Sequence, residues 1–435
     1  MSQPMQDRSG REALVESTTP LVRVETTPAP SNGEDGRHGD VLGLAKLATI
    51  QFRGLDIMPT YQRLAALLQQ DQTDVAPLMD VAIIDQFLGW PQRGLTIQSA
   101  ALVAQRLFRI PAASAPKLRL LGFAMAGPIN ANIPVEFLIE DSDVELHLVY
   151  IVPGMPVPAV PDHDLAIVLA AESETARPIF AYLEILLADW PRPVLDRPER
   201  VPLLGRESLY HLIESVPGID IPATVRVGAQ TFAEIGAGAA SIEELLPDGG
   251  FPIIARPVDS HGGQGLEKLQ TAAEVENYRI RNAVPEYYLS RFVDYRSPDG
   301  CYRKYRIAVI DGVPFASHLA ISEHWMIHFL NAGMGESDEK RREEADFMDR
   351  FESEFAARHG RAFAEMANRS GLEYFGVDCG ETPDGKLLIF EADTSLIVHN
   401  MDSPVEFPYK DRHMRALFAA FRAMLTRKAL TPTTR

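Results

Sequence analysis

YFGVDC at 374–379 and LLIFEAD at 387–393 are two apolar runs separated by the turn signal Pro383-Asp384-Gly385. Apolar runs on both sides of such a turn predict a β-hairpin or a close pair of strands. Because side chains alternate along a strand, Glu391 and Asp393 point to one face. Asp378 lies near the end of the neighbouring strand, so we expect three carboxylates to meet on a largely apolar sheet.

Three acidic side chains at one place repel one another unless a cation neutralises them. Mg²⁺ prefers hard oxygen ligands, keeps several waters and bridges to nucleotide phosphates. Asp378, Glu391 and Asp393 are therefore our candidate magnesium ligands, with Mn²⁺ as an alternative metal. The first hypothesis is an enzyme that uses Mg-ATP; the alternative is three solvated strand ends.

The bulk composition bounds the class of protein. At 435 residues the chain exceeds a single core, which predicts two or three domains. The net charge of −18 argues against nucleic acid and anionic membranes as main partners. Two cysteines cannot form a disulfide framework, which favours a reduced, cytoplasmic setting. No membrane span and no signal segment are expected, since neither pattern occurs.

The first two regions are distinguished by composition. Residues 1–40 are rich in Ser, Thr, Pro, Gly and charge, which predicts a disordered tail. Residues 41–115 carry apolar residues at helical spacing, which predicts two or three helical hairpins, with one helix opened by Thr96 and Ser99. This region is interpreted as an α-helical cap or dimerisation module. A tetratricopeptide-like module is the alternative, although no 34-residue repeat is visible.

The remaining chain is divided at about residue 200. Residues 116–200 alternate short apolar strands with helices, which predicts a small α/β domain. Residues 201–430 carry the chemical signals. The elements expected in these two regions are strands at 118–123, 135–138, 145–150 and 165–170, a helix at 179–187, a proline-rich linker or crossover at 191–202, a mobile loop at 336–344, a long helix at 346–368 and an amphipathic helix at 411–427.

A cationic strand runs into a glycine-rich loop. The expected strand 251–257 carries Arg256 near its end and leads into DSHGGQGL at 259–266. Successive backbone N–H groups in such a turn form an anion-binding concavity, and an arginine can fork onto phosphate oxygens. A plain hairpin turn is the alternative. The order of cationic strand, glycine loop and acidic strand pair favours phosphate binding.

Two further strands complete the candidate site. The aromatic strand end at 288–294 could hold a purine, although an ordinary core strand explains it as well. In the strand 302–311, Lys304 and Arg306 share one face. An inward cation is costly to bury without an anion. A transferring phosphoryl group or a developing oxyanion would serve.

This order of segments, over about 117–425, resembles the ATP-grasp superfamily, near the glutathione synthetase and RimK-type carboxylate–amine ligases. The resemblance implies an α/β fold, with an α+β ATP-grasp domain after a small α/β domain; here an α-helical region precedes both. It implies ATP and Mg²⁺ as cofactors, and a carboxylate substrate and an amine acceptor, which would be a small amino acid, a peptide or a protein. Dimers are common in the superfamily, so a homodimer is one expected state.

The resemblance also assigns residues. It places the magnesium ligands at Asp378, Glu391 and Asp393, where the family often has Asn at the last position. The assigned catalytic residues are Arg306, His324 and Asn331. The assigned nucleotide-binding residues are Arg206, Arg256, His261, Gly262, Gly263, Gln264, Gly265, Arg291, Phe292 and Val293. Arg206 and Arg256 stand where the family commonly has two lysines, and His324 and Asn331 where better-known ligases have Arg and Asn.

Several histidines leave more than one interpretation open. His318, His324 and His328 are spaced six and four apart. They fit structural histidines, substrate binding or proton transfer, or a metal site. His399 and the two polar residues that follow it closely fit either substrate contact or a capped turn before Pro404.

The sequence thus predicts an ATP-dependent ligase that forms an amide through an acyl phosphate. A kinase on the same fold, which would stop after phosphoryl transfer, is the first alternative. A non-catalytic scaffold that senses nucleotide is the second, and an intact set of carboxylates argues against it.

Overall fold

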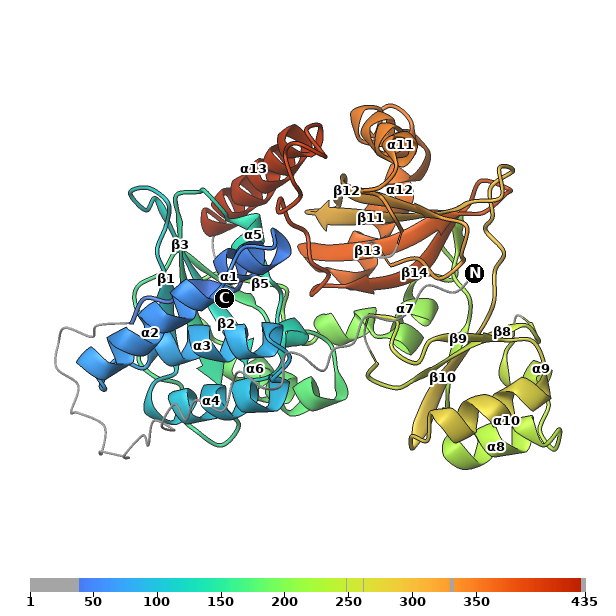
Figure 1. The fold of residues 1–435 in the computed structure, drawn as a ribbon, viewed down its shortest axis with the longest axis horizontal. Helices are drawn as coiled ribbons and strands as arrows, with labels where there is room; N and C mark the ends of the chain where they lie inside the picture. Colours follow the sequence, from blue (N-terminus) through green and yellow to red (C-terminus); the bar gives the residue numbers. More distant parts are fainter. Residues whose placement is uncertain (1–38, 248, 261, 329–331, 432–435) are drawn as a thin grey trace.

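Three β-sheets organise the part of the chain that the computed structural model describes, residues 39–247, 249–260, 262–328 and 332–431. In Figure 1 the first sheet and helices α1–α4 form the lobe at left, and the two other sheets lie one above the other at right. The expected fold class is confirmed: a mixed α/β fold with a small α/β unit and an N-terminal helical region. The tail predicted at 1–40 lies outside the described residues, apart from its last two positions.

The first sheet has the strand order β1-β3-β2-β4-β5. Its strands are β1 (Leu107–Ile110), β2 (Leu118–Met125), β3 (Val144–Ile151), β4 (Leu165–Val168) and β5 (Val194–Leu195). All neighbours are parallel except β1, which runs antiparallel to β3. The four residues of β4 are all buried, as expected for a parallel strand covered on both faces.

Four helices precede this sheet, and helix α6 (Arg177–Leu187) follows β4. The four are α1 (Gly43–Phe52), α2 (Met58–Gln70), α3 (Ala76–Phe87) and α4 (Pro91–Ala104). The prediction that Thr96 and Ser99 open a helix was wrong. Helix α4 starts at Pro91, because proline at the first turn needs no N–H partner, and both hydroxyls donate to carbonyls four residues earlier.

One further prediction for the first lobe was wrong. The run 135–138 forms helix α5 (Val135–Leu138) instead of a strand. Pro134 precedes it, and the turn buries Val135, Phe137 and Leu138 while the Glu136 carboxylate accepts from the Ala45 N–H at 2.9 Å. The segment 191–202, predicted as a linker or crossover, contains strand β5 and leads into a 3₁₀ turn, η5 (Val201–Leu204). Two more 3₁₀ turns are η3 (Ile129–Ala131) and η4 (Glu174–Ala176).

The second sheet is antiparallel, with the order β7-β10-β8-β9. Its strands are β7 (Thr224–Gly228), β8 (Ile253–Pro257), β9 (Glu267–Leu269) and β10 (Glu286–Arg291), and its helices are α8 (Ala229–Gly236), α9 (Ile242–Leu245) and α10 (Ala272–Arg281). Phe232, Tyr278 and Tyr287 are buried together in its separate core. Figure 1 shows α8 and α10 covering the side of this sheet that faces away from the third sheet.

The third sheet has the order β12-β11-β13-β14-β6. Its strands are β6 (Ile219–Asp220), β11 (Tyr302–Ile310), β12 (Val313–Ser322), β13 (Tyr374–Glu381) and β14 (Leu387–Asp393), and its helices are α11 (Asp338–Asp349) and α12 (Phe355–Ser370). The predicted strand pair 374–379 and 387–393 is confirmed as the antiparallel hairpin β13–β14. A register shift beside Asp378 brings that residue opposite Glu391.

The long helix predicted at 346–368 is two helices, and the loop predicted at 336–344 is mostly helix α11. Ser337 caps α11 by accepting from the Lys340 N–H at 3.3 Å. The break follows Asp349: the Ser353 hydroxyl donates to the Arg350 carbonyl at 3.2 Å, a local bond that competes with the helical pattern.

Helices α7 (Arg206–Ile213) and α13 (Lys410–Ala429) connect the lobes. Helix α13, predicted at 411–427, contacts α5 and β4 of the first lobe as well as β11 and β12 of the third sheet. Arg422 binds Asp143 at 2.8 Å across this junction.

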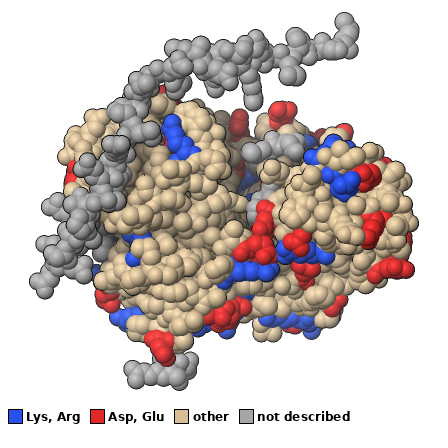
Figure 2. Space-filling view, turned by 90° about the horizontal axis from the view of Figure 1, so that it is seen from below, with Lys and Arg blue, Asp and Glu red and all other residues tan. Residues whose placement is uncertain are grey.

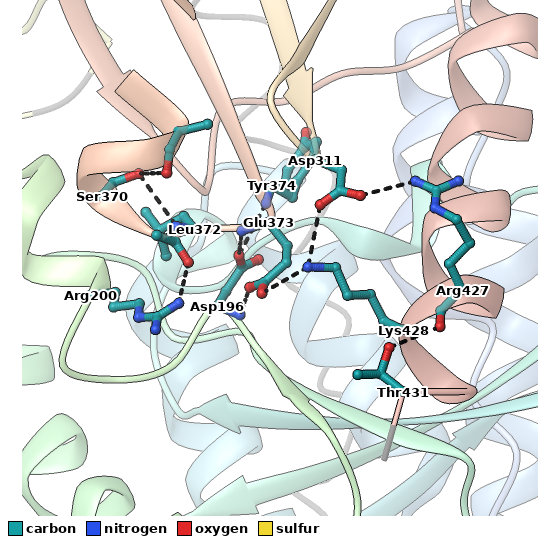
Figure 3. A network of polar contacts seen from close by, with 12 residues as sticks. Asp196, Arg200, Asp311, Ser370, Leu372, Glu373, Tyr374, Arg427, Lys428 and Thr431 are labelled. Carbon is teal, nitrogen blue, oxygen red and sulfur yellow. Dashed lines mark hydrogen bonds and ion pairs between the residues drawn. The ribbon is translucent and has the colours of Figure 1, made fainter. Parts of the chain in front are cut away.

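A buried polar network joins the same lobes (Figure 3). Asp196, just after β5, is fully buried and accepts from the N–H groups of Glu373 and Tyr374 at 2.8 and 3.0 Å. In return, the Glu373 carboxylate accepts from the Asp196 N–H at 2.9 Å. Lys428 of α13 binds both Glu373 and Asp311. Hydrogen bonds thus join the end of the first sheet to the start of β13, and Lys428 joins the start of β13 to α13.

The surface is unevenly charged. On the face in Figure 2, few charged side chains lie over the lobe at left, where α4 and α6 carry few ionisable residues, and many more lie over the lobe at right. Among the described helices, none is both long and apolar enough to cross a membrane.

Candidate functional site

A cavity of ≈ 590 Å³ lies between the second and third sheets. Strands β8 and β10 supply one wall, and β11, β13 and β14 supply the other, with the start of α7 and the segment 325–328 closing the sides. The first lobe contributes Asn130 and Glu172. The predicted residues that line this cavity are Arg206, Arg256, Gly262, Gly263, Arg291, Phe292, Val293, Arg306, Asp378, Glu391 and Asp393.

Asp378 is bound by two cations from the neighbouring strand. Arg306 donates from Nε and Nη2 to its two carboxylate oxygens at 2.7 and 2.9 Å, and Lys304 Nζ donates at 2.9 Å. Burial alone would raise the pKa of Asp378, but the charges of Arg306 and Lys304 outweigh it and hold that pKa well below its usual range. From the sequence, we expected that inward cations on β11 need an anionic partner. That partner is Asp378, an acid of the same sheet.

Glu391, opposite Asp378, is bound from the start of α7. Arg206 Nη2 lies 2.6 Å from its carboxylate. Burial opposes the charged form of Glu391, yet the charge of Arg206 lowers its pKa overall. Asp393 points to the same cavity two residues later, and its Oδ1 accepts from the Ser395 N–H at 2.8 Å.

Arg256 on β8 is only 8% exposed and donates from Nε to the Ser260 hydroxyl at 3.0 Å. Burial, and next the repulsion of Arg206, lower the pKa of Arg256 to about 10. The glycine loop begins here: Asp259, Gly262 and Gly263 have φ of 58°, 59° and 77°. Gly262 and Gly263 line the cavity, and their open backbone suits close approach of an anion.

Not every predicted loop residue reaches the cavity. Gln264 and Gly265 are described but are not among its lining residues. Gly265 is fixed for another reason, because a Cβ there would lie 2.7 Å from Pro257 and its φ is +67°. His261 lies outside the described residues.

The predicted adenine-binding stretch lies at the end of β10. Arg291 binds Asp220 at 2.6 Å. The Phe292 ring meets the Lys268 ammonium at 3.5 Å on one side and the Trp325 ring, edge to face, at 5.6 Å. Phe292 N–H donates to the Pro252 carbonyl at 3.0 Å. These contacts give the cavity an aromatic end, next to Val293.

The three histidines His318, His324 and His328 lie in different places. His318 is buried on β12 opposite Arg306, and burial, with Arg306 next, lowers its pKa well below the usual value. His328 lines the cavity, and burial followed by Lys304 lowers its pKa. His324 instead lines a second cavity of ≈ 390 Å³ beside Lys268. Asn331 lies outside the described residues.

The sequence interpretation did not assign several lining residues. Glu172, Tyr288, Trp325 and His328 line the cavity, and so does Lys304. The shared face of Lys304 and Arg306 was the available signal for Lys304. Glu172 follows β4 of the first sheet, and the carboxyl end of a parallel strand is a common place for ligand contacts. Burial, then Asp393 and Asp259, raises the pKa of Glu172 to about 7.

The carboxylates do not form a ready-made metal cage. Among the described residues, no group of three or more His, Cys, Asp or Glu side chains is placed to hold a metal ion. Mg²⁺ in nucleotide sites typically takes one or two carboxylates and completes its shell with phosphates and water. Asp378 and Glu391, on facing positions of β13 and β14, fit that mode.

Two sheets that enclose a cavity with a glycine loop and an acidic hairpin match the arrangement expected from the sequence. This arrangement is similar to the ATP-grasp fold that the sequence resembles. A scan against protein-family models and a search of curated proteins found no match. The RimK domain ATP-grasp protein of Sphaerobacter thermophilus DSM 20745 is a similar solved structure, 17% identical with a TM-score of 0.41, covering 72% of this chain and 100% of that one.

Two more similar solved structures are ligases. D-alanine–D-alanine ligase of Bacillus anthracis, complexed with ATP, is 12% identical with a TM-score of 0.42, over 72% of this chain and 98% of that one. VanG D-Ala:D-Ser ligase of Enterococcus faecalis is 12% identical with a TM-score of 0.44, over 71% and 99%.

Proposed function

We propose that this chain is an ATP-dependent ligase that joins a carboxylate to an amine, using Mg-ATP. The observation that carries the proposal is the convergence of Arg206, Arg256, Lys304 and Arg306 on one cavity, around the facing carboxylates of Asp378 and Glu391. Cations grouped on the wall of a partly buried cavity favour a polyanionic ligand.

Arg256 supports a phosphate ligand specifically. Its guanidinium is held in a buried place near another arginine, which lowers its pKa to about 10. A triphosphate would offset both burial and repulsion, because arginine forks onto phosphate oxygens. The glycine loop next to Arg256 offers backbone N–H groups to the same anion.

The metal is assigned to the acidic hairpin. When bound, Mg²⁺ would neutralise phosphate charge beside Asp378, Glu391 and Asp393. Arg206 and Lys304 would then turn from these carboxylates toward the phosphates. Aromatic Phe292 and apolar Val293 would hold the base at the other end of the cavity.

The proposed reaction consumes ATP, a carboxylate and an amine, and yields an amide, ADP and phosphate. The carboxylate oxygen takes the γ-phosphoryl group and ADP leaves; the amine nitrogen then displaces phosphate from the acyl carbon and loses a proton. Arg306 would stabilise the charge that develops on the phosphoryl group and on the tetrahedral species. The glycine loop would exclude water, which hydrolyses acyl phosphates.

The first test is a thermal-shift titration with a non-hydrolysable ATP analogue, with and without Mg²⁺. A ligand that binds the folded state raises Tm by mass action. We expect a magnesium-dependent rise for the wild type that is lost in Glu391→Ala. Asp384→Ala is the matched control, because Asp384 lies in the turn of the same hairpin and binds the neighbouring Lys386 instead.

No rise for the wild type at millimolar nucleotide would overturn the proposal. If nucleotide binds, incubation with amino acids and small peptides should yield ADP, phosphate and an amide. A stable phosphorylated product without an amide would instead indicate a kinase.

The domain boundaries, a cytoplasmic setting and a homodimer stay predictions from the sequence.

A further inference from the structure

Residues 393–402, named the strap, run from the cavity to the N-terminal helices. The first part of the strap lines the cavity through Asp393, Ser395, Leu396 and Ile397. Its last part lies against helices α1, α5 and α13. It therefore connects the candidate reaction centre to the helical region for which the sequence suggested no chemistry.

At the cavity end, the strap holds Arg306. The Ile397 carbonyl accepts from Arg306 Nη1 at 3.1 Å, while Nε and Nη2 of the same guanidinium bind Asp378. Arg306 thus donates two hydrogen bonds to Asp378 of β13 and a third to the strap. Since a guanidinium is planar and rigid, these three bonds together fix both its position and its tilt.

At the other end, helix α1 holds the strap. Met401 is 5% exposed and packs in one cluster with Ala45 of α1 and Phe137 of α5. Arg53, directly after α1, donates from Nε to the Met401 carbonyl at 3.3 Å. The Phe52 ring lies 5.2 Å from the His399 ring.

The strap also stabilises its own turn and is held by α13. His399 Nδ1 accepts from the Met401 N–H at 3.1 Å, which keeps the residues between the two anchors bent. Asn400 donates to Asp411 at 2.8 Å, and Asp402 binds Lys410 at 2.9 Å. Helix α1 is therefore one of two anchors, so loosening it should shift the strap rather than release it.

We propose that Phe52 and Arg53 are positioning residues for Arg306, acting through the strap. The proposal rests on the proposed function, in which Arg306 must meet a developing negative charge. A small displacement of the Ile397 carbonyl would turn the guanidinium and weaken that contact, and catalytic groups lose much rate for small displacements. The helical region would thus set turnover without touching nucleotide or substrate.

The test is a kinetic comparison of the wild type with a Phe52→Ala/Arg53→Ala double variant. We expect kcat for ADP formation to fall about 3- to 30-fold, the range for residues that act through a coupling network. KM for ATP and the magnesium-dependent thermal shift should not change, because Arg206 binds Glu391 and Arg256 binds Ser260, and both of these partners lie outside the strap. Arg53→Lys alone keeps a donor and should retain kcat.

Two controls separate positioning from general damage. Gln51→Ala removes an exposed side chain from the same turn of α1 and should behave as the wild type. Hydrogen exchange of the amides at 394–402 should be faster in the double variant, and this readout needs no turnover. Should the double variant fail to fold, Arg53→Ala alone is measured in the same way.

The outcomes distinguish the two proposals. A wild type that binds no nucleotide overturns the proposed function, whatever the strap does. A wild type that binds and turns over, beside a double variant with unchanged kcat, overturns the positioning proposal alone. Unchanged exchange at 394–402 in the double variant also overturns it.

Discussion

Arg306 binds Asp378 through two parallel hydrogen bonds, from Nε to Oδ1 at 2.7 Å and from Nη2 to Oδ2 at 2.9 Å. The two residues occupy facing positions of β11 and β13. The side chain of Asp378 is 3% exposed and that of Arg306 17%. Arg306 and Asp378 thus form a bidentate ion pair within the protein. In the proposed function, a metal ion at Asp378 would share the carboxylate with Arg306, which would bring the arginine next to the phosphates.

Arg306→Ala should lower kcat for ADP formation by roughly 10²–10³, the scale for losing one transition-state donor. The affinity for nucleotide should change little, since Arg206 and Arg256 remain. Steady-state kinetics with a saturating acceptor measure the effect. Arg306→Lys keeps the positive charge but loses the paired N–H donors of the guanidinium, so its kcat should lie between those of the wild type and Arg306→Ala. Unchanged turnover in Arg306→Ala would remove Arg306 from the mechanism.

Asp378→Asn should destabilise the protein, because two cations then lose their shared anion in a buried place. Breaking a buried pair from one side costs roughly 3–5 kcal/mol, and residual solvent contact of Lys304 and Arg306 lowers our expectation to roughly 2–3 kcal/mol. Urea unfolding measures the loss. Tripolyphosphate should restore part of the stability in the variant, and without it Asp384→Asn should be as stable as the wild type.

Local signals in the sequence predicted much of this site. The hairpin β13–β14 and the glycine loop were predictable because apolar runs, a turn and glycines encode them within a few residues. Helix α5 was not, because a short apolar run fits strand or helix and Glu136 finds its partner on α1. Glu172 reaches the cavity from another sheet, so its place there depends on how the first lobe packs against the other two sheets.

Asp196→Ala should weaken the junction shown in Figure 3. Asp196 has φ of +46°, which aspartate tolerates better than alanine, and its carboxylate accepts from two backbone N–H groups. Loss of that acceptor and the backbone strain should cost roughly 3 kcal/mol in the free energy of unfolding. Urea unfolding checks this.

Asp196→Asn is the matched variant, because asparagine keeps the acceptor oxygen and tolerates the same backbone. It should stay within roughly 1 kcal/mol of the wild type. If both variants lose equal stability, the acidic charge itself holds the junction, and the backbone account given for Asp196→Ala is wrong.

Glu136 should make stability depend on pH. Burial, and then the repulsion of Asp80, raises its pKa to about 7, although the Ala45 N–H opposes the shift. A raised carboxyl pKa means that the folded state holds the proton more tightly than the unfolded chain. Its contribution to stability is therefore fully present below about pH 4.5, the ordinary value, and is lost as the pH rises through about 7.

Glu136→Gln removes this titration and keeps an oxygen acceptor for Ala45. The free energy of unfolding of the variant, relative to the wild type, should therefore rise by roughly 1–2 kcal/mol between pH 5 and pH 8. Urea unfolding at both pH values measures the difference, with exposed Glu184→Gln on α6 as the control that should show no change. A difference that is the same at pH 5 and pH 8 would show that Glu136 is ionised in the folded state throughout, so that contact with the start of α1 outweighs burial.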